Sequence, residues 1–287
     1  MIELRLGDLE ATVALAGAEL QGLRWRGQEL LWDGDPAWWS RRAPLLFPIV
    51  ARLQDDELRV DGRSYTLPQH GFARDLPWKP LEQAPSSCLL GLRDDAGTRA
   101  CFPFAFELQQ RVTLVSGGLE LVWTLANPGP GPLIASLGAH PAFRWPLPGG
   151  QRDQHVLEFE IEEPEPVRRL AGGLLRAEPE TSPVEGRRLF LHDELFQTGA
   201  LIFDRLRSRR ARYSAPGSPK LELAWDFPHF AVWTKPGAPF LCLEPWQGFS
   251  DPEAFRGDFS AKPGTVTLQE GAARSWTFSI RVSEALP

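Results

Sequence analysis

The residue with the clearest chemical potential is Glu244, which follows a short apolar run at residues 241–243. The sequence Pro-Trp-Gln-Gly comes directly after it. We expect the run to be a strand that delivers one carboxylate and stops at the proline. An indole and an amide beside a single acid are typical of a sugar pocket, because pyranose rings present apolar C–H faces and polar rims. A strand-end glutamate that points to water before a turn is the alternative interpretation.

Two of the five histidines lie in segments framed by small or rigid residues. His70 is followed by Gly71, and His140 stands between Ala139 and Pro141 at the expected end of a strand. Glycine and proline restrict or release the backbone at such places, so that one side chain is aimed in a fixed direction. Taken singly, each histidine also fits a hydrogen-bonded turn.

Several kinds of catalytic site do not fit this sequence. Zinc-ligand spacings such as HxH or HExxH do not occur, so we expect no metal site and no metal cofactor. A GxSxG elbow for a hydrolytic serine does not occur either. A glycosidase would need a pair of carboxylates, and Glu244 has no acidic counterpart in an equally constrained loop.

A glutamate with one or two histidines does suit mutarotation of a sugar. One group removes the proton of the O1 hydroxyl while another protonates the ring oxygen, and the ring opens to the aldehyde. Rotation about C1–C2 and closure on the other face give the second anomer. The reaction requires a matched base and acid, and it needs no redox cofactor, nucleophile or metal.

Four segments carry a family resemblance. They are Phe-Pro-Ile-Val-Ala-Arg at 47–52, Pro-Gln-His-Gly-Phe-Ala-Arg at 68–74, Gly-Ala-His-Pro-Ala-Phe at 138–143 and Cys-Leu-Glu-Pro-Trp at 242–246. In this order, over nearly the whole chain, they resemble the aldose 1-epimerase (galactose mutarotase-like) family, and most of all its LacX-like and hexose-6-phosphate-mutarotase-like branches. The HGFAR and EPW segments together are fairly specific. The resemblance implies a large antiparallel β-sandwich with an open concave face that binds the sugar.

The resemblance also implies roles for the three candidate catalytic residues. Glu244 matches the general base of the family, and His140 matches its usual general acid. His70 matches a histidine that holds or protonates the ring oxygen.

Five further residues are predicted to bind the substrate. Arg52 matches an arginine that binds hydroxyls, whereas Gln69 and Arg74 match positions that line the pocket in the phosphosugar branch. Galactose-type members use an aspartate for ring hydroxyls, and its nearest match, by a loose alignment, is Asp193. We place Trp246 at the edge of the pocket.

Three functions are therefore open. The main prediction is a mutarotase for a hexose or hexose derivative, without implied galactose preference, because Ala51-Arg52 replaces the Asn-Arg pair of galactose-type enzymes. A hexose-6-phosphate mutarotase would need a basic cluster, for which Arg74 and Lys79 are the candidates near a motif. A non-catalytic carbohydrate-binding or sensing protein on the same scaffold would be expected to lack one member of the acid/base set.

The elements that must position these residues are predicted to be strands almost throughout. Apolar and polar residues alternate over 2–32, an Asp-Gly turn marks a hairpin over 58–67, and sixteen or more strand candidates follow in all, without βαβ alternation. Only 38–43 and 251–255 are candidate short helices. We expect an all-β fold, a large antiparallel β-sandwich or barrel that forms one domain over residues 1–287.

Composition limits the partners. The 287 residues are 43% hydrophobic, enough for a sizeable core, and carry a net charge of −6, which argues against nucleic acid. Neither a run of about 20 apolar residues nor a signal-peptide pattern occurs, so no membrane association is expected. The three cysteines are far apart and fit reduced thiols in a cytoplasmic protein. We expect a monomer or homodimer whose partner is a small sugar.

Overall fold

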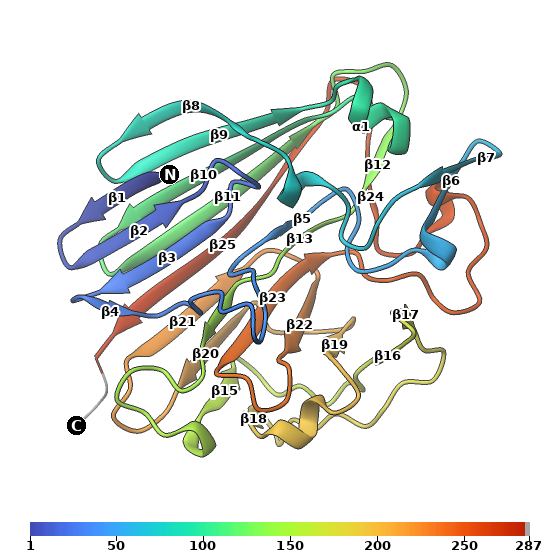
Figure 1. Cartoon of the computed structure of the whole chain (residues 1–287). Helices are drawn as coiled ribbons and strands as arrows, with labels where there is room; N and C mark the ends of the chain where they lie inside the picture. Colours follow the sequence, from blue (N-terminus) through green and yellow to red (C-terminus); the bar gives the residue numbers. More distant parts are fainter. Residues whose placement is uncertain (285–287) are drawn as a thin grey trace.

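The computed structural model describes residues 1–284, and antiparallel strands dominate it (Figure 1). The predicted all-β fold with large antiparallel sheets is confirmed. Within the described residues, no helix is long and apolar enough to cross a membrane.

The largest sheet has nine strands, and its long members lie side by side in Figure 1. Side chains alternate between buried and half-buried along its central strands, as expected for a sheet with one face on the core. In spatial order the strands are β18 (Arg188–Phe190), β15 (Val156–Phe159), β20 (Arg210–Ser214), β21 (Lys220–Trp225), β25 (Ala273–Ser283), β11 (Gly118–Ala126), β10 (Glu107–Val115), β9 (Ser87–Arg93) and β8 (Lys79–Ala84).

A second sheet of six strands packs against the first. Its order is β19 (Leu201–Phe203), β22 (His229–Trp233), β23 (Phe240–Gln247), β13 (Leu137–Ala139) and β5 (Leu45–Leu46), and β14 (Ala142–Arg144) also pairs with β23. Leu241 and Leu243 of β23 join Trp276 and Phe278 of β25 in one hydrophobic cluster. The core therefore lies between the two sheets.

The strand β23, at the centre of the six-stranded sheet, presents its even-numbered residues to the side that faces away from the main core. Cys242 and Trp246 belong to two smaller clusters apart from the main core. Because side chains alternate along a strand, Glu244 shares that outer face with them. All eight residues of β23 are buried, so both faces are covered.

Smaller sheets and short helices complete the described chain. The N-terminal sheet is β1 (Ile2–Leu6), β2 (Leu9–Val13), β3 (Leu20–Trp25) and β4 (Gln28–Glu29), and the paired strands are β6 (Glu57–Val60) with β7 (Arg63–Thr66), β12 (Leu133–Ala135) with β24 (Val266–Leu268) and β16 (Leu170–Ala171) with β17 (Leu174–Leu175). The 3₁₀ turns are η1 (Gln54–Asp56), η2 (Ala73–Asp75), η3 (Arg152–Gln154), η4 (Asp193–Phe196) and η5 (Phe259–Ala261), and the α-helix is α1 (Ala96–Cys101).

The predicted short helices are wrong. Turns occupy residues 36–38 and 253–254, where helices over 38–43 and 251–255 were candidates. The helix α1 was not predicted, although its start carries a local signal. Asp95 accepts a hydrogen bond from the Thr98 N–H, and the Thr98 hydroxyl accepts one from the Asp95 N–H, which is a capping box.

Candidate active site

A cleft of about 330 Å³ opens over the outer face of the six-stranded sheet. We call it the Glu244 cleft. It brings together all three predicted catalytic residues and three of the five predicted substrate-binding residues. Its lining residues are Trp39, Ala51, Gln69, His70, Arg74, His140, Leu170, Gly199, Ala200, Trp233, Glu244 and Trp246.

Glu244 and His140 form a close pair in the floor of this cleft. Glu244 lies on the central strand β23, opposite Ala231 of β22, and is 1% exposed. His140 follows β13 directly, and its Nε2 lies 3.2 Å from Oε2 of Glu244. The pairing of β13 and β14 with β23 fixes both sides of this contact.

Aromatic rings hold the His140 imidazole from two sides. Its ring centroid lies 4.9 Å from that of Trp39 and 5.7 Å from that of Trp233, the latter in an edge-on arrangement. Both tryptophans also line the Glu244 cleft. The same rings can therefore orient an imidazole and offer apolar faces to a sugar ring.

A reciprocal pair of hydrogen bonds with Ala51 holds His70. The His70 N–H donates to the Ala51 carbonyl (2.8 Å), and the Ala51 N–H donates to Nδ1 of His70 (3.1 Å). Because Nδ1 accepts a hydrogen bond, the proton of the neutral ring belongs on Nε2. The ring centroids of His70 and His140 are 5.8 Å apart. His70 thus stands beside the pair with a defined tautomer.

The backbone that carries His70 leaves room only for glycine at the next position. His70 has φ of 67° and Gly71 has φ of +67°. A Cβ atom on Gly71 would lie 2.3 Å from the Phe47 carbonyl oxygen. The glycine that sequence reasoning took as a sign of an aimed histidine is therefore a steric requirement of this loop.

Burial shifts the pKa values of all three candidate catalytic residues. The pKa of Glu244 is raised well above its usual range by desolvation, with the nearby Trp246 N–H acting in the opposite direction. Desolvation lowers the pKa of His140 to about 3 and lowers that of His70 well below its usual range. Repulsion from His140, Arg74 and Arg41 adds to the shift at His70. In the free protein these shifts favour a neutral carboxyl beside neutral imidazoles.

Three buried polar atoms around the Glu244–His140 pair have no hydrogen-bond partner among residues 1–284. They are Nδ1 of His140, Oε2 of Glu244 and Nε1 of Trp246. Oε2 of Glu244 is among them because the 3.2 Å approach of His140 Nε2 lacks hydrogen-bond geometry. Buried polar groups in proteins are normally paired, and exceptions need an explanation. A polar ligand in the cleft would supply the missing partners.

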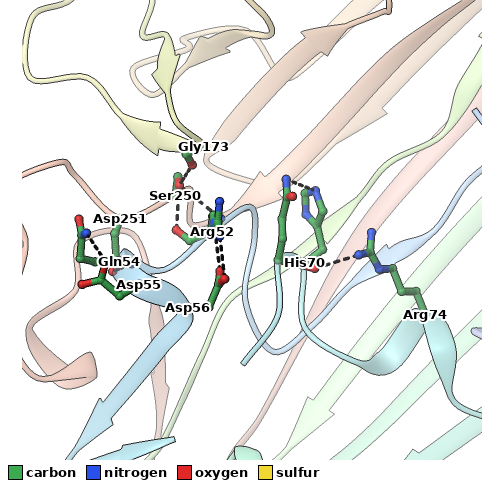
Figure 2. Close-up of polar contacts among 10 residues, drawn as sticks. Arg52, Gln54, Asp55, Asp56, His70, Arg74, Gly173, Ser250 and Asp251 are labelled. Atoms are coloured by element: carbon green, nitrogen blue, oxygen red, sulfur yellow. Dashed lines mark hydrogen bonds and ion pairs between the residues drawn. The ribbon is translucent and has the colours of Figure 1, made fainter. Parts of the chain in front are cut away.

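The structure does not place Arg52 where it was predicted. Its guanidinium forms a two-pronged ion pair with Asp56, with both N–O distances at 2.7 Å (Figure 2). Arg52 is not one of the cleft-lining residues of the described chain. Ala51, in the left-handed region at φ of 58°, lines the cleft instead. The carboxylate four residues further on then holds the Arg52 side chain.

Asp193 also lies outside the predicted location. Its Oδ1 accepts hydrogen bonds from Nη2 of Arg152 (2.7 Å) and from the Gly237 N–H (2.9 Å). These contacts tie two loops together, and Asp193 is not among the residues that line the cleft in the described part of the chain. The prediction that it faces the sugar site rested on a loose alignment and is not supported by its position.

The cleft has a cationic side that sequence reasoning found only in part. Arg74 lines the cleft, and its Nη2 donates to the Gln69 carbonyl (2.9 Å). Its buried Nε has no hydrogen-bond partner among residues 1–284 and lies 3.7 Å from Oδ2 of Asp75. Arg41 reaches the Arg74 carbonyl at 3.4 Å and pairs with Asp75. Burial, and after it the charge of Arg41, lowers the pKa of Arg74, while Asp75 acts in the opposite direction. Arg41 carries no motif, so only the structure reveals it.

The fold is that of galactose mutarotase-like proteins. A galactose mutarotase-like protein from Lactobacillus casei ATCC 334 matches with a TM-score of 0.92 at 30% identity, over 99% of this chain and 100% of that one. The galactose mutarotase related enzyme from Lactobacillus acidophilus matches with a TM-score of 0.91 at 27% identity, over 100% of this chain and 99% of that one.

Sequence comparison defines the family. The sequence model of the aldose 1-epimerase family matches residues 1–281. The chromosomal protein LacX of Lactococcus lactis subsp. lactis is 32% identical over 266 residues, which are 87% of this chain and 88% of that one. The chain therefore belongs to the aldose 1-epimerase family, and the predicted resemblance is confirmed.

Proposed function

We propose that this protein is an aldose 1-epimerase that interconverts the α and β anomers of a hexose or hexose derivative. The observation that carries the proposal is the meeting of Glu244, His140 and His70 at one cleft, with buried polar atoms that lack partners within residues 1–284. The cleft volume of about 330 Å³ is at the small end of ligand pockets and suits a single sugar ring.

The geometry fits a base and an acid that act on neighbouring oxygens. In a pyranose, O1 and the ring oxygen are both bonded to C1, so the two catalytic groups must stand side by side. Oε2 of Glu244 and Nε2 of His140 are 3.2 Å apart and meet this condition. In the reacting complex the carboxyl proton of Glu244 has passed to His140 across this contact. Glu244 then takes the O1 proton, the bond from C1 to the ring oxygen breaks, and His140 donates its proton to the ring oxygen.

The reverse sequence closes the ring on the other face after rotation about C1–C2. The C5 hydroxyl attacks C1 and gives its proton back to His140. At the same time Glu244 returns the proton that it took from O1 to the carbonyl oxygen. The raised pKa of Glu244 makes its ionised form a stronger base, and the lowered pKa of His140 makes its imidazolium a stronger acid. Hydroxyls of the sugar supply the solvation that the buried carboxylate lacks.

His70 is assigned to the ring oxygen as a hydrogen-bond donor. Its Nδ1 accepts from the Ala51 N–H, which leaves the proton of the neutral ring on Nε2. That nitrogen lies 3.3 Å from the side-chain amide of Gln69, and the ring oxygen of the sugar would replace this contact. Trp39, Trp233 and Trp246 line the cleft and offer apolar faces for the C–H side of the ring.

A second candidate function, mutarotation of a hexose 6-phosphate, is favoured by the cationic side of the cleft. Arg74 lines the cleft and is repelled by the neighbouring Arg41, and Asp75 is the one carboxylate paired with both among residues 1–284. An anionic group of the substrate beside Arg74 would relieve the rest of the repulsion. A guanidinium also suits phosphate oxygens geometrically. Lys79, the other basic candidate from the sequence, begins the edge strand β8 and is not a cleft-lining residue of the described chain.

Polarimetry on freshly dissolved α-D-glucose, α-D-galactose, α-D-glucose 6-phosphate and α-D-galactose 6-phosphate tests both functions. An approach to equilibrium faster than in buffer alone supports a mutarotase. A KM much lower for the phosphates, raised in Arg74→Gln but not in the exposed control Arg63→Gln, supports the phosphosugar function. No acceleration over buffer with any of the four sugars, together with measurable sugar binding, would instead indicate a binding protein.

A further inference from the structure

A third buried donor accompanies the Glu244–His140 pair. The Sγ of Cys242, an imidazole nitrogen of His140 and a carboxylate oxygen of Glu244 all lie within 4.8 Å of one another. All three residues are buried, and Cys242 is fully inaccessible. The proposed reaction uses the carboxylate and the imidazole but has no use for the thiol.

Strand geometry brings the three donors together. Cys242 and Glu244 are two residues apart on β23 and therefore project from the same face. Ala142 of β14 pairs directly with Cys242, which holds the preceding His140 beside the strand. The cluster thus belongs to the rigid centre of the six-stranded sheet.

The chemistry of this donor set favours thiophilic divalent cations. A thiolate, an imidazole and a carboxylate are all ligands of Zn²⁺, and three protein ligands with a fourth position open are the usual arrangement of an accessible zinc site. Softer ions such as Cd²⁺ also prefer sulfur and nitrogen donors, whereas Mg²⁺ and Ca²⁺ prefer oxygen. Two of the buried donor residues, Glu244 and His140, also present atoms that have no partner within residues 1–284.

The donor atoms need only a small adjustment. Ligand atoms of a tetrahedral zinc ion with bonds of about 2.0 to 2.3 Å stand about 3.3 to 3.8 Å apart. The present limit of 4.8 Å would have to close by at most about 1 to 1.5 Å. The Glu244–His140 pair, at 3.2 Å, already meets the requirement. Because His140 and Glu244 line the cleft, a cation can reach the cluster through the sugar site.

We propose that Cys242, His140 and Glu244 form a binding site for thiophilic divalent cations such as Zn²⁺ and Cd²⁺, and that its occupation inhibits the protein. On binding, the sulfur–metal bond replaces the S–H bond of Cys242 and an oxygen–metal bond replaces the O–H bond of the Glu244 carboxyl. Both protons pass to solvent, without any redox change. The ion occupies the base and the acid at once, so inhibition is competitive with the sugar. The inhibition rests on the proposed function, whereas the binding does not.

Titration of the protein with CdCl₂, followed by the ultraviolet thiolate-to-cadmium charge-transfer band, tests the binding. We expect the band in the wild type and in Cys88→Ala, a matched control that removes another fully buried cysteine, on β9. We expect its loss in Cys242→Ala and in the volume-conserving Cys242→Ser. No band in the wild type, or a band that persists in both Cys242 variants with unchanged thermal unfolding, would overturn the proposal.

Activity measurements in the presence of ZnCl₂ test whether occupation of the site inhibits the enzyme. The ZnCl₂ concentration that halves the activity should be at least about tenfold higher in Cys242→Ala, which lacks one direct ligand. Even residues that only hydrogen-bond to a metal ligand contribute about 10- to 100-fold to metal affinity. Cys88→Ala should match the wild type. A wild-type enzyme that binds Cd²⁺ but stays active under saturating Zn²⁺ contradicts the inhibition. A protein that binds Cd²⁺ but never accelerates mutarotation retains the metal site and refutes the proposed function alone.

Discussion

At the scale of single residues, the proposed role of Glu244 as a base requires an ionised carboxylate, whereas its buried position opposes ionisation. The carboxyl is 1% exposed and has no salt bridge to lysine or arginine within residues 1–284. Burial therefore raises its pKa in the folded state. Such a group costs stability while it makes a strong base, which is a common property of catalytic residues.

This conflict predicts a pH-dependent gain in stability for Glu244→Gln. Below the unfolded-state pKa of about 4.3, Glu244 is protonated in both states and no penalty arises. As the pH rises toward the raised folded-state pKa, the unfolded state loses the proton first, and the wild type loses up to about 1.4 kcal/mol of unfolding free energy per pH unit. Chemical denaturation should show an advantage of the variant that grows from pH 4 to pH 8. The same difference at both pH values would refute the raised pKa.

The candidate site was partly predictable at this scale. Glu244, His70 and His140 could be selected because a proline or glycine next to each residue fixes its backbone, and the family resemblance joined them. Arg52 and Asp193 could not be placed, because a sequence match does not reveal which carboxylate or carbonyl takes a side chain. The left-handed conformation of Ala51, which turns the next residue toward Asp56, has no sequence signal.

At the scale of elements, the loop that carries His70 is held by backbone contacts with the segment before Ala51. Gly71 pairs with Phe47 as an isolated bridge, and the N–H groups of Phe72 and Ala73 donate to the Phe47 carbonyl. The position of the imidazole therefore depends on a close approach of two chains that only a glycine permits.

We expect Gly71→Ala to lower both stability and activity. The Cβ would meet the Phe47 carbonyl oxygen at 2.3 Å in a backbone conformation that alanine disfavours, so the loop must move. A loss of about 1 to 3 kcal/mol in urea denaturation is expected, with a marked fall in kcat. The control is Gly62→Ala, which has φ of +73° at an exposed hairpin turn and no atom within 4 Å of its Cβ. Equal effects of the two substitutions on kcat would contradict the role of this loop.

The strands were more predictable than the turns. The alternation along β1, β2 and the long β10–β11 hairpin is visible as a period of two in the sequence, and the Asp-Gly turn correctly marked β6 and β7. β23 has no such pattern, because both of its faces are covered. Its assignment depended on the apolar run and the proline.

At the scale of the whole molecule, one hydrophobic cluster contains residues from Ile2 to Val282. This distribution favours the predicted single domain over residues 1–287, which stays a prediction. Scanning calorimetry should then give one transition whose calorimetric and van't Hoff enthalpies agree. Two separable transitions would indicate independent domains.

The buried pair of Lys262 and Asp251 connects the last part of the chain to the loop after Arg52. Lys262 Nζ lies 2.7 Å from Oδ1 of Asp251, and the Gln54 N–H donates to Oδ2 (2.8 Å). Loss of one partner leaves an uncompensated buried charge, at a cost of about 3 to 5 kcal/mol. We expect Lys262→Met to lower the free energy of unfolding by that order in urea denaturation, with the exposed control Lys79→Met near the wild type. Equal stability of Lys262→Met and the wild type would contradict this role.

The decisive measurement on the proposed base is the kcat of Glu244→Gln, determined together with the affinity of this variant for the sugar. The substitution keeps the shape of the side chain but removes the proton acceptor. We predict that kcat on the best sugar falls by about 10² to 10⁴, the usual contribution of a general base, while the Kd for that sugar changes only a few-fold. A variant with wild-type kcat, or one that loses affinity without losing kcat, would contradict the mechanism.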